Sequence, residues 1–108
     1  RVEQLVSVYH DTADHRLAAA VVSLRLRKVG RRWVQTVKRR GDGTAANGLF
    51  SHLEDELPAP GGRLVLDGPD PEGALAAVRA AADGAPLAPV FETRVRRIVE
   101  RLAAPGGG

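Results

Sequence analysis

The stretch SLRLRKVGRRWVQTVKRR, residues 23–40, decides the fold of this chain. Gly30 and Arg31 lie at its centre, and glycine at the first of two central positions suits a type II′ turn between two strands. Pairing outward from that turn sets Val29 opposite Arg32, Arg27 opposite Val34, Arg25 opposite Thr36, and Ser23 opposite Lys38. The stretch therefore predicts an antiparallel hairpin with one register.

The two faces of this hairpin differ in chemistry, because side chains alternate across a strand. One face carries the polar and charged residues with one valine: Ser23, Arg25, Arg27, Val34, Thr36 and Lys38. The other face carries large apolar residues: Leu24, Leu26, Trp33 and Val37. A register shifted by one residue would mix the two groups, so their separation supports the pairing. We expect one cationic side and one apolar side.

Three further strands are expected outside the hairpin, over residues 2–10, 49–57 and 89–102. The last segment also fits a helical pattern, and its β-branched residues favour a strand. Residues 41–48 have the composition of a flexible loop, and residues 103–108 that of a disordered, Gly-rich tail.

Two helices are expected, a short one over residues 13–20 and a longer one over residues 71–83. Asp11 or Thr12 can cap the first helix, and Asp70 can cap the second. The element order shows no alternation of strands and helices. It therefore predicts an α+β fold with an antiparallel sheet.

Composition excludes several classes of protein. The 108 residues suffice for one small domain, and the absence of cysteine excludes disulfides, thiolate metal sites and cysteine nucleophiles. No apolar run approaches the roughly 20 residues that span a bilayer, and no secretory pattern is present, so we expect a cytoplasmic protein without a membrane partner. The net charge of +3 favours anionic partners. The few aromatic residues argue against a nucleic-acid partner.

The cationic side of the hairpin is the candidate site. Arg25 and Arg27, two residues apart, can converge with Lys38 on one polyanion, since guanidinium groups bind phosphate oxygens in pairs and an ammonium group adds a compact charge. Glu54 and Glu56 have the same alternate spacing and could balance these cations or hold Mg²⁺ or Mn²⁺. From composition alone, a solvated sheet face is the favoured reading.

The order of motifs adds a resemblance. The segment VYHDTADHRLAAAVVSLRLRKVGRRWVQTVKRR, residues 8–40, resembles the CYTH domain of the triphosphate tunnel metalloenzymes, with its Tyr-x-Asp-Thr, Leu-Arg-x-Arg and Thr-x-Lys motifs. LEDELPAPG, residues 53–61, is similar to the family's Glu-x-Glu strand, and PVFETRVRR, residues 89–97, to its Phe-x-Thr-x-x-x-Arg strand. The family includes inorganic triphosphatases, thiamine triphosphatases and one class of adenylate cyclase. The resemblance covers most of the chain, from about residue 5 to residue 97.

The resemblance implies a fold and a set of site residues. It implies that the sheet is part of a tunnel-like barrel whose polar lumen holds a triphosphate. The implied substrate-binding residues are Arg25, Arg27, Lys38, Arg94 and Arg96. Glu54 and Glu56 are implied as catalytic and metal-linked residues, with Mg²⁺ or Mn²⁺ as the metal. The family's opening Glu-x-Glu-x-Lys strand and its closing acidic strands have no counterpart, so we expect a partial CYTH-like domain over residues 1–102.

Three hypotheses about function follow and stay open at this point. The first is binding, and in a complete domain metal-dependent hydrolysis, of inorganic or organic triphosphates. The second is a non-catalytic module that binds polyphosphate or a nucleotide. The third is a domain whose open sheet edges promote self-association.

Overall fold

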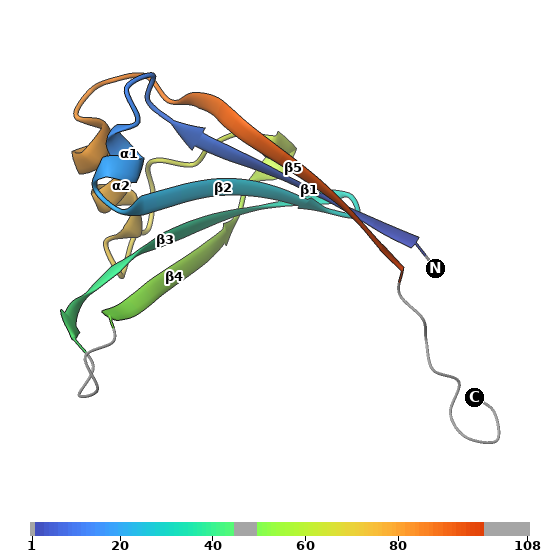
Figure 1. The fold of residues 1–108 in the computed structure, drawn as a ribbon, viewed down its shortest axis with the longest axis horizontal. Coiled ribbons are helices and arrows are strands. Elements are labelled where there is room, and N and C mark those ends of the chain that lie inside the picture. Colours follow the sequence, from blue (N-terminus) through green and yellow to red (C-terminus); the bar gives the residue numbers. More distant parts are fainter. Residues whose placement is uncertain (1, 45–49, 99–108) are drawn as a thin grey trace.

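The computed structural model describes residues 2–44 and 50–98 (Figure 1). The expectations for residue 49, for the end of the last strand and for the tail at residues 103–108 lie outside the described residues. The elements are, in chain order, β1 (Val2–Asp11), α1 (Arg16–Ala19), β2 (Val22–Val29), β3 (Arg32–Thr44), β4 (Phe50–Pro58), the 3₁₀ helix η1 (Pro60–Gly62), α2 (Ala74–Ala82) and β5 (Ala88–Ile98).

The five strands form one antiparallel sheet in the order β4-β3-β2-β1-β5. Figure 1 shows this sheet curved, with β1 and β5 along one side, β3 and β4 along the other, and both helices at one end. The α+β prediction with a part-barrel sheet is therefore confirmed. In the part of the chain that the structure describes, no helix is long and apolar enough to cross a membrane.

The hairpin of β2 and β3 has the register that the sequence predicts. Val29 pairs with Arg32, Arg27 with Val34, Arg25 with Thr36, and Ser23 with Lys38. Gly30 has φ of 62°, whereas Arg31 has no positive φ, as a type II′ turn requires. The turn and the alternation of side chains thus set the separation of the two sheet faces.

The core lies between the apolar face of the hairpin and the helices. Its members are almost fully buried aliphatic side chains from β2, β3, α1 and α2: Leu17, Leu24, Val37, Ala74, Val78 and Ala82. Leu24 and Val37 belong to the face that the hairpin pattern predicts as apolar. The helices therefore cover that face and leave the opposite, cationic face without helical cover.

Both helices are confirmed but are shorter than the sequence predicts. α1 begins at Arg16 because His15, at φ 57°, takes a left-handed conformation that no helix can continue through. α2 begins at Ala74 for the same reason, since Gly73 has φ of 75°. The Asp70 carboxylate still accepts hydrogen bonds from the backbone N–H groups of Leu75 and Ala76, both at 2.9 Å.

Two other expectations are resolved by the sheet pairing. The strand interpretation of the last segment is correct, because β5 pairs with β1 along its length. The expected loop at residues 41–48 is wrong for residues 41–44, which continue β3. Thr44 pairs with Phe50 of β4, and a composition-based reading cannot detect such pairing.

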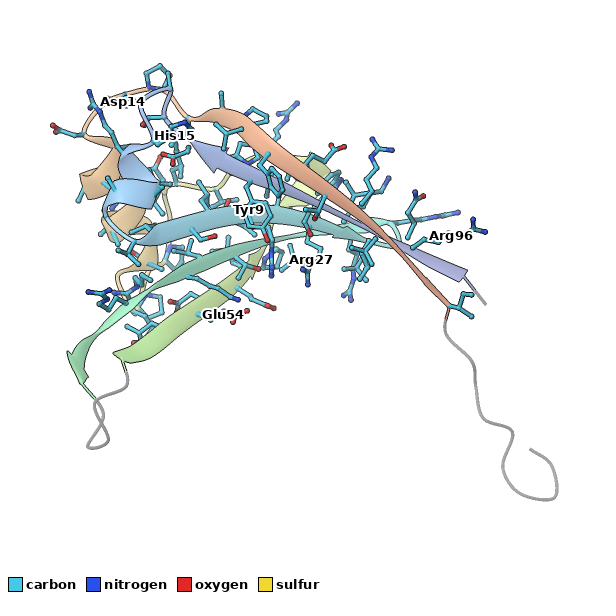
Figure 2. The ribbon with its side chains drawn as sticks, viewed as in Figure 1. Tyr9, Asp14, His15, Arg27, Glu54 and Arg96 are labelled. Atoms are coloured by element: carbon cyan, nitrogen blue, oxygen red, sulfur yellow. The ribbon has the colours of Figure 1, made fainter. Side chains whose placement is uncertain are left out.

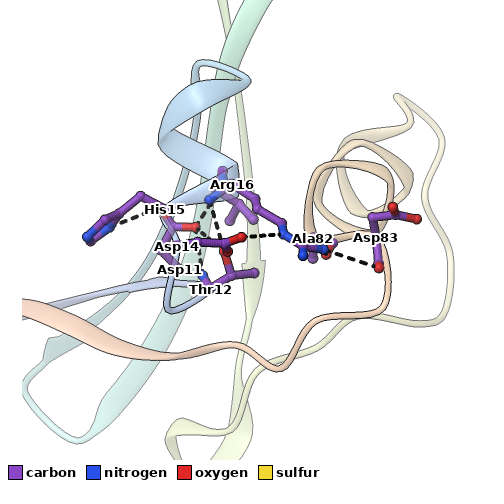
Figure 3. A network of polar contacts seen from close by, with 8 residues as sticks. Asp11, Thr12, Asp14, His15, Arg16, Ala82 and Asp83 are labelled. Carbon is purple, nitrogen blue, oxygen red and sulfur yellow. Dashed lines mark hydrogen bonds and ion pairs between the residues drawn. The ribbon is translucent and has the colours of Figure 1, made fainter.

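The turn between β1 and α1 is organised by the carboxylate of Asp11 (Figure 3). It accepts hydrogen bonds from the backbone N–H groups of Thr12, Leu17 and Ala18, at 2.7, 2.8 and 3.1 Å. Burial raises the pKa of Asp11. These three hydrogen bonds and the charge of His15 together lower it by a larger amount, so the pKa lies below its ordinary value. The expected capping role of Asp11 is confirmed.

Candidate anion-binding site

We call the helix-free side of the sheet that carries Arg25, Arg27 and Lys38 the cationic face. Its side chains lie in rows across the strands, because opposite residues of an antiparallel pair share a face. The central row joins Tyr9, Arg25, Thr36 and Glu56, and the rows on either side join Ser7, Arg27 and Val34, and Ser23, Lys38 and Glu54. The register thus brings all five expected hairpin and β4 charges onto one face.

The three cations are close enough to share one anion. Arg25 and Arg27 are alternate residues of β2, so their Cβ atoms lie about 7 Å apart. Lys38 is the diagonal neighbour of Arg25 across the β2–β3 pair, a separation of about 7–8 Å. These spacings are shorter than the reach of two long side chains. The predicted convergence of Arg25, Arg27 and Lys38 is therefore sterically available.

The two arginines are held by neutral partners. Arg25 Nη2 donates to Thr36 Oγ1 at 3.3 Å, and Arg27 Nε donates to Ser7 Oγ at 3.0 Å. Within residues 2–44 and 50–98, neither guanidinium group forms an ion pair with a carboxylate. Both side chains are half-buried, so their charges are shielded less by water than those of surface arginines.

Arg25 also has a donor that the protein does not satisfy. Its Nε is buried and has no hydrogen-bond partner among the described residues. A buried donor without an acceptor costs about 1–3 kcal/mol. The Nε of Arg39, on the opposite face, is buried and unpartnered in the same way, so the feature that sets Arg25 apart is its neutral partner Thr36 and not this donor.

The carboxylates on this face lie beside the lysine. Glu54 Oε2 is 4.0 Å from Lys38 Nζ, and both side chains are about half exposed. Glu56 lies opposite Thr36, in the same row as Arg25 and next to the row of Lys38 and Glu54. Figure 2 shows Tyr9, Arg27 and Glu54 converging on the inner side of the curved sheet from β1, β2 and β4. Among the five expected site residues, three cations and two carboxylates leave one positive charge in excess.

Arg94 and Arg96 are not brought together with the other expected site residues. Arg94 pairs with Val6, and Arg96 pairs with Gln4, so both occupy the face opposite to that of Ser7 and Arg27. Arg94 Nε is engaged with Glu92 Oε2 at 2.8 Å. Figure 2 draws Arg96 well away from Arg27 and Glu54. A substrate-binding role for Arg94 and Arg96 stays a prediction that the register does not support.

The structure adds residues that the sequence analysis did not assign. Ser7 orients Arg27, and Thr36 orients Arg25, so each arginine has a hydroxyl partner on the neighbouring strand. Both hydroxyl residues are almost fully buried, at 3% and 2% exposure. Ser7 could have been recognised as a polar residue between Val6 and Val8, in the middle of the first strand.

Two cavities border the cationic face at opposite ends of the hairpin. One, of about 410 Å³, lies beside α1 and is lined by Tyr9, Ser23 and Lys38 among others. The other, of about 460 Å³, lies by the hairpin turn and includes Arg31, Arg32 and Glu56. Neither cavity includes Arg25 or Arg27.

The residues present do not form a metal site by themselves. Glu54 and Glu56 supply two carboxylates, and the described part of the chain contains no cluster of three His, Cys, Asp or Glu residues that could hold a metal ion. Magnesium keeps several water ligands and is usually bound by one or two carboxylates together with substrate phosphates. The described residues of this face therefore fit an anion, and Glu54 and Glu56 would hold such a metal only together with water and a bound phosphate.

Comparison with known proteins agrees with this geometry. A sequence model of the CYTH domain family matches residues 1–106. A search of curated proteins finds no match to the chain. The family match extends over nearly all of the sequence, and the five-stranded sheet with two helices is consistent with its barrel-like fold. The chain therefore belongs to the CYTH domain family.

Proposed function

We propose that this chain binds triphosphate-containing small molecules, inorganic or organic, on its cationic face. CYTH domains in general bind or hydrolyse triphosphates. The observation that carries the proposal is the pair Arg25 and Arg27, two half-buried arginines at alternate positions of β2. Among the described residues, their hydrogen-bond partners are the hydroxyl groups of Thr36 and Ser7.

The chemistry of these side chains suits a linear polyanion. A guanidinium group can donate two parallel hydrogen bonds to the oxygens of one phosphate, and two guanidinium groups in alternate positions can engage successive phosphates. Lys38, on the neighbouring strand, would add a third positive charge on the side of Arg25 that is away from Arg27. Affinity would come from fixed charges and oriented donors, and it would weaken with salt because half of the Lys38 side chain is in solvent.

Calorimetric titration with tripolyphosphate, pyrophosphate and orthophosphate tests this proposal. We expect affinity to rise with the number of phosphates, because each additional phosphate can reach another of the three cations. Raising the salt concentration should weaken binding of the longest anion most. Equal affinity for all three anions would contradict a site in which several cations bind successive phosphates of one anion.

A second candidate function is binding without turnover, as a polyphosphate- or nucleotide-binding module. The observation that favours it is the position of Glu54 beside Lys38, where its charge balances a cation, together with the lack of a third carboxylate among the described residues. The CYTH family is metal-dependent. We nevertheless propose hydrolysis by this chain as the less supported alternative. In that alternative, the catalytic and metal-linked residues are Glu54 and Glu56, and the metal is Mg²⁺ or Mn²⁺.

Measurement of phosphate release separates hydrolysis from binding without turnover. The substrates are tripolyphosphate, ATP and thiamine triphosphate, each with and without Mg²⁺ or Mn²⁺. Release that requires the metal and is lost in Glu56→Gln would establish hydrolysis. Tight binding of tripolyphosphate without release in any condition would establish the binding module. The cytoplasmic location expected from the sequence stays a prediction.

A further inference from the structure

The cavity beside α1 borders one end of the cationic face. Its volume of about 410 Å³ lies within the range of about 300–1,000 Å³ that is usual for small-molecule sites. Ser23 and Lys38 line it from the cationic face, and Tyr9 joins it to the row of Arg25. Most of its lining comes from α1 and from β1, β2 and β3, which are interior strands of the sheet. An anion bound at Lys38 would have this cavity directly beside it.

Val21 lines this cavity in a strained backbone conformation. Its φ is 58°, in the left-handed region, where a β-branched residue is a genuine outlier. Glycine would adopt this conformation without strain, yet the chain has a large apolar side chain here that is 47% exposed and outside the core cluster. Strain of this kind is found most often at ligand sites. It therefore indicates that the side chain of Val21 contacts a ligand and does not serve the core.

Val90 reaches the same cavity through a second backbone irregularity. In β5, Phe91 pairs with Tyr9 and Pro89 pairs with His10. Val90, between them, has no partner in β1 and is the extra residue of a bulge. A bulge changes the direction of a side chain, and bulges are frequent beside active sites. Val90 is 44% exposed and lines the cavity, so two separate irregularities bring exposed valines to one place.

Two rings complete the uncharged part of the lining. The half-buried ring of Tyr9 lies 5.8 Å from that of Phe91 at a tilt of 50°, and this contact supports it from β5. Burial lowers the pKa of His10, so its imidazole is neutral at neutral pH. An aromatic wall together with two exposed valines suits a flat, largely apolar ring system.

The charged groups of the cavity disfavour a cationic ring. Lys38 and Arg39 line it with positive charges. The carboxylate of Asp11 also lines it, but this group already accepts three backbone hydrogen bonds and lies 3.9 Å from the ring of His15. A positively charged ring would therefore lie beside two cations without a free carboxylate to balance it. The lining fits a neutral heteroaromatic group.

We propose that this cavity holds the neutral heteroaromatic base of a nucleoside triphosphate whose phosphates lie on the cationic face. The inference rests on the proposed binding of triphosphates and narrows it from triphosphates in general to organic ones. The phosphate nearest the sugar would lie at Lys38, and the terminal phosphate would lie toward Arg27. Val21, Val90 and Tyr9 would determine the preference for the organic group.

Calorimetric titration without metal compares ATP, thiamine triphosphate and tripolyphosphate. We expect ATP to bind about tenfold more tightly than tripolyphosphate despite its lower charge, because its base covers exposed apolar side chains. Thiamine triphosphate should bind more weakly than ATP, since its thiazolium ring is positively charged. Tripolyphosphate that binds as tightly as ATP would overturn this inference and leave the proposed function intact. Absence of binding by all three would overturn both.

Two variants separate the cavity from the fold. Val21→Gly removes an apolar side chain and the backbone strain together. It should weaken ATP binding about tenfold, leave tripolyphosphate binding unchanged and not lower the midpoint of thermal unfolding. Val90→Ser should weaken ATP binding with the same selectivity.

The matched control is Val29→Ser, at an exposed valine outside the cavity and at the other end of β2, which should change neither affinity. Unchanged ATP affinity in both cavity variants would overturn the assignment of the cavity. Equal losses of ATP and tripolyphosphate affinity in these variants would overturn it as well.

Discussion

Arginine side chains on the two faces of the sheet have different partners. Arg39, on the helix-covered face, has the carboxylate of Asp55 at 3.9 Å and donates to the backbone carbonyl of Glu72. Arg25 and Arg27, on the cationic face, have only the hydroxyl groups of Thr36 and Ser7. The same two strands therefore carry one arginine with a carboxylate partner and, among the described residues, a pair without one. This difference indicates that one face stabilises the fold, whereas the other is available to an anion.

The largest expected effect is a loss of stability on the helix-covered face. Leu24 is 1% exposed and packs in the core between β2, β3 and the helices. Leu24→Ala should lower the free energy of unfolding by about 2–5 kcal/mol, which is a large part of the total for a small domain. Urea unfolding followed by circular dichroism measures this change. Val29→Ala, at a position 41% exposed at the end of β2, is the matched control and should lose under about 1 kcal/mol.

The next effect concerns the turn that attaches α1 to this face. Asp11→Ala should lower the free energy of unfolding by about 1–3 kcal/mol, because three backbone N–H groups lose their charged acceptor. Asp67→Ala, a substitution of an almost fully exposed carboxylate, should change it little. Equal effects of the two substitutions in urea unfolding would show that the Asp11 network does not hold the turn.

The same carboxylate gives a pH dependence. The pKa of Asp11 in the folded state lies below its ordinary value of 3.8, so the folded state binds fewer protons than the unfolded state in that range. Its stabilising contribution is therefore complete above pH 3.8 and is lost as the pH falls through the lower folded pKa. Thermal unfolding between pH 6 and pH 2 should show a shallower acid slope in Asp11→Ala than in the wild type. Parallel slopes would contradict this assignment.

The smallest expected effect on stability concerns Glu54, on the cationic face. Glu54→Gln should change the free energy of unfolding by under about 1 kcal/mol, because its ion pair with Lys38 is long and half exposed. Without metal, the same substitution should strengthen tripolyphosphate binding a few-fold, since it removes a negative charge from the site. Glu72→Gln, an exposed glutamate outside the sheet, is the control for net charge. Weaker binding of tripolyphosphate by Glu54→Gln in the presence of Mg²⁺ would instead favour a metal-linked glutamate.

The hairpin was predictable because its information is local. Gly30 fixes the turn, and the alternation of Leu24 and Leu26 with Arg25 and Arg27 leaves one register that keeps the apolar residues together. The position of Glu54 followed from the same alternation on the next strand. Elements set by short-range turn geometry and period-two patterns therefore emerge from the sequence alone.

Features that depend on distant pairing were not predictable in the same way. Which face of β5 carries Arg94 is fixed by its pairing with Val6, from the other end of the chain. The hydrogen bond from Arg27 to Ser7 depends on the β1–β2 register, which no single motif specifies. The early start expected for α2 failed because Gly73 has a left-handed backbone conformation, which the cap signals at Asp70 and Pro71 do not reveal.

The comparison of the two faces is tested most directly by tripolyphosphate titration of two matched double variants. One carries Arg25→Gln and Arg27→Gln on the cationic face, and the other carries Arg94→Gln and Arg96→Gln on the opposite face. Each removes two positive charges, the first from the cationic face and the second from the opposite face. We expect the first to weaken binding about 100-fold, from two lost charged hydrogen-bonding groups, and the second to weaken it less than about threefold. Equal losses in the two variants, or unchanged binding in the first, would contradict an anion site on the cationic face.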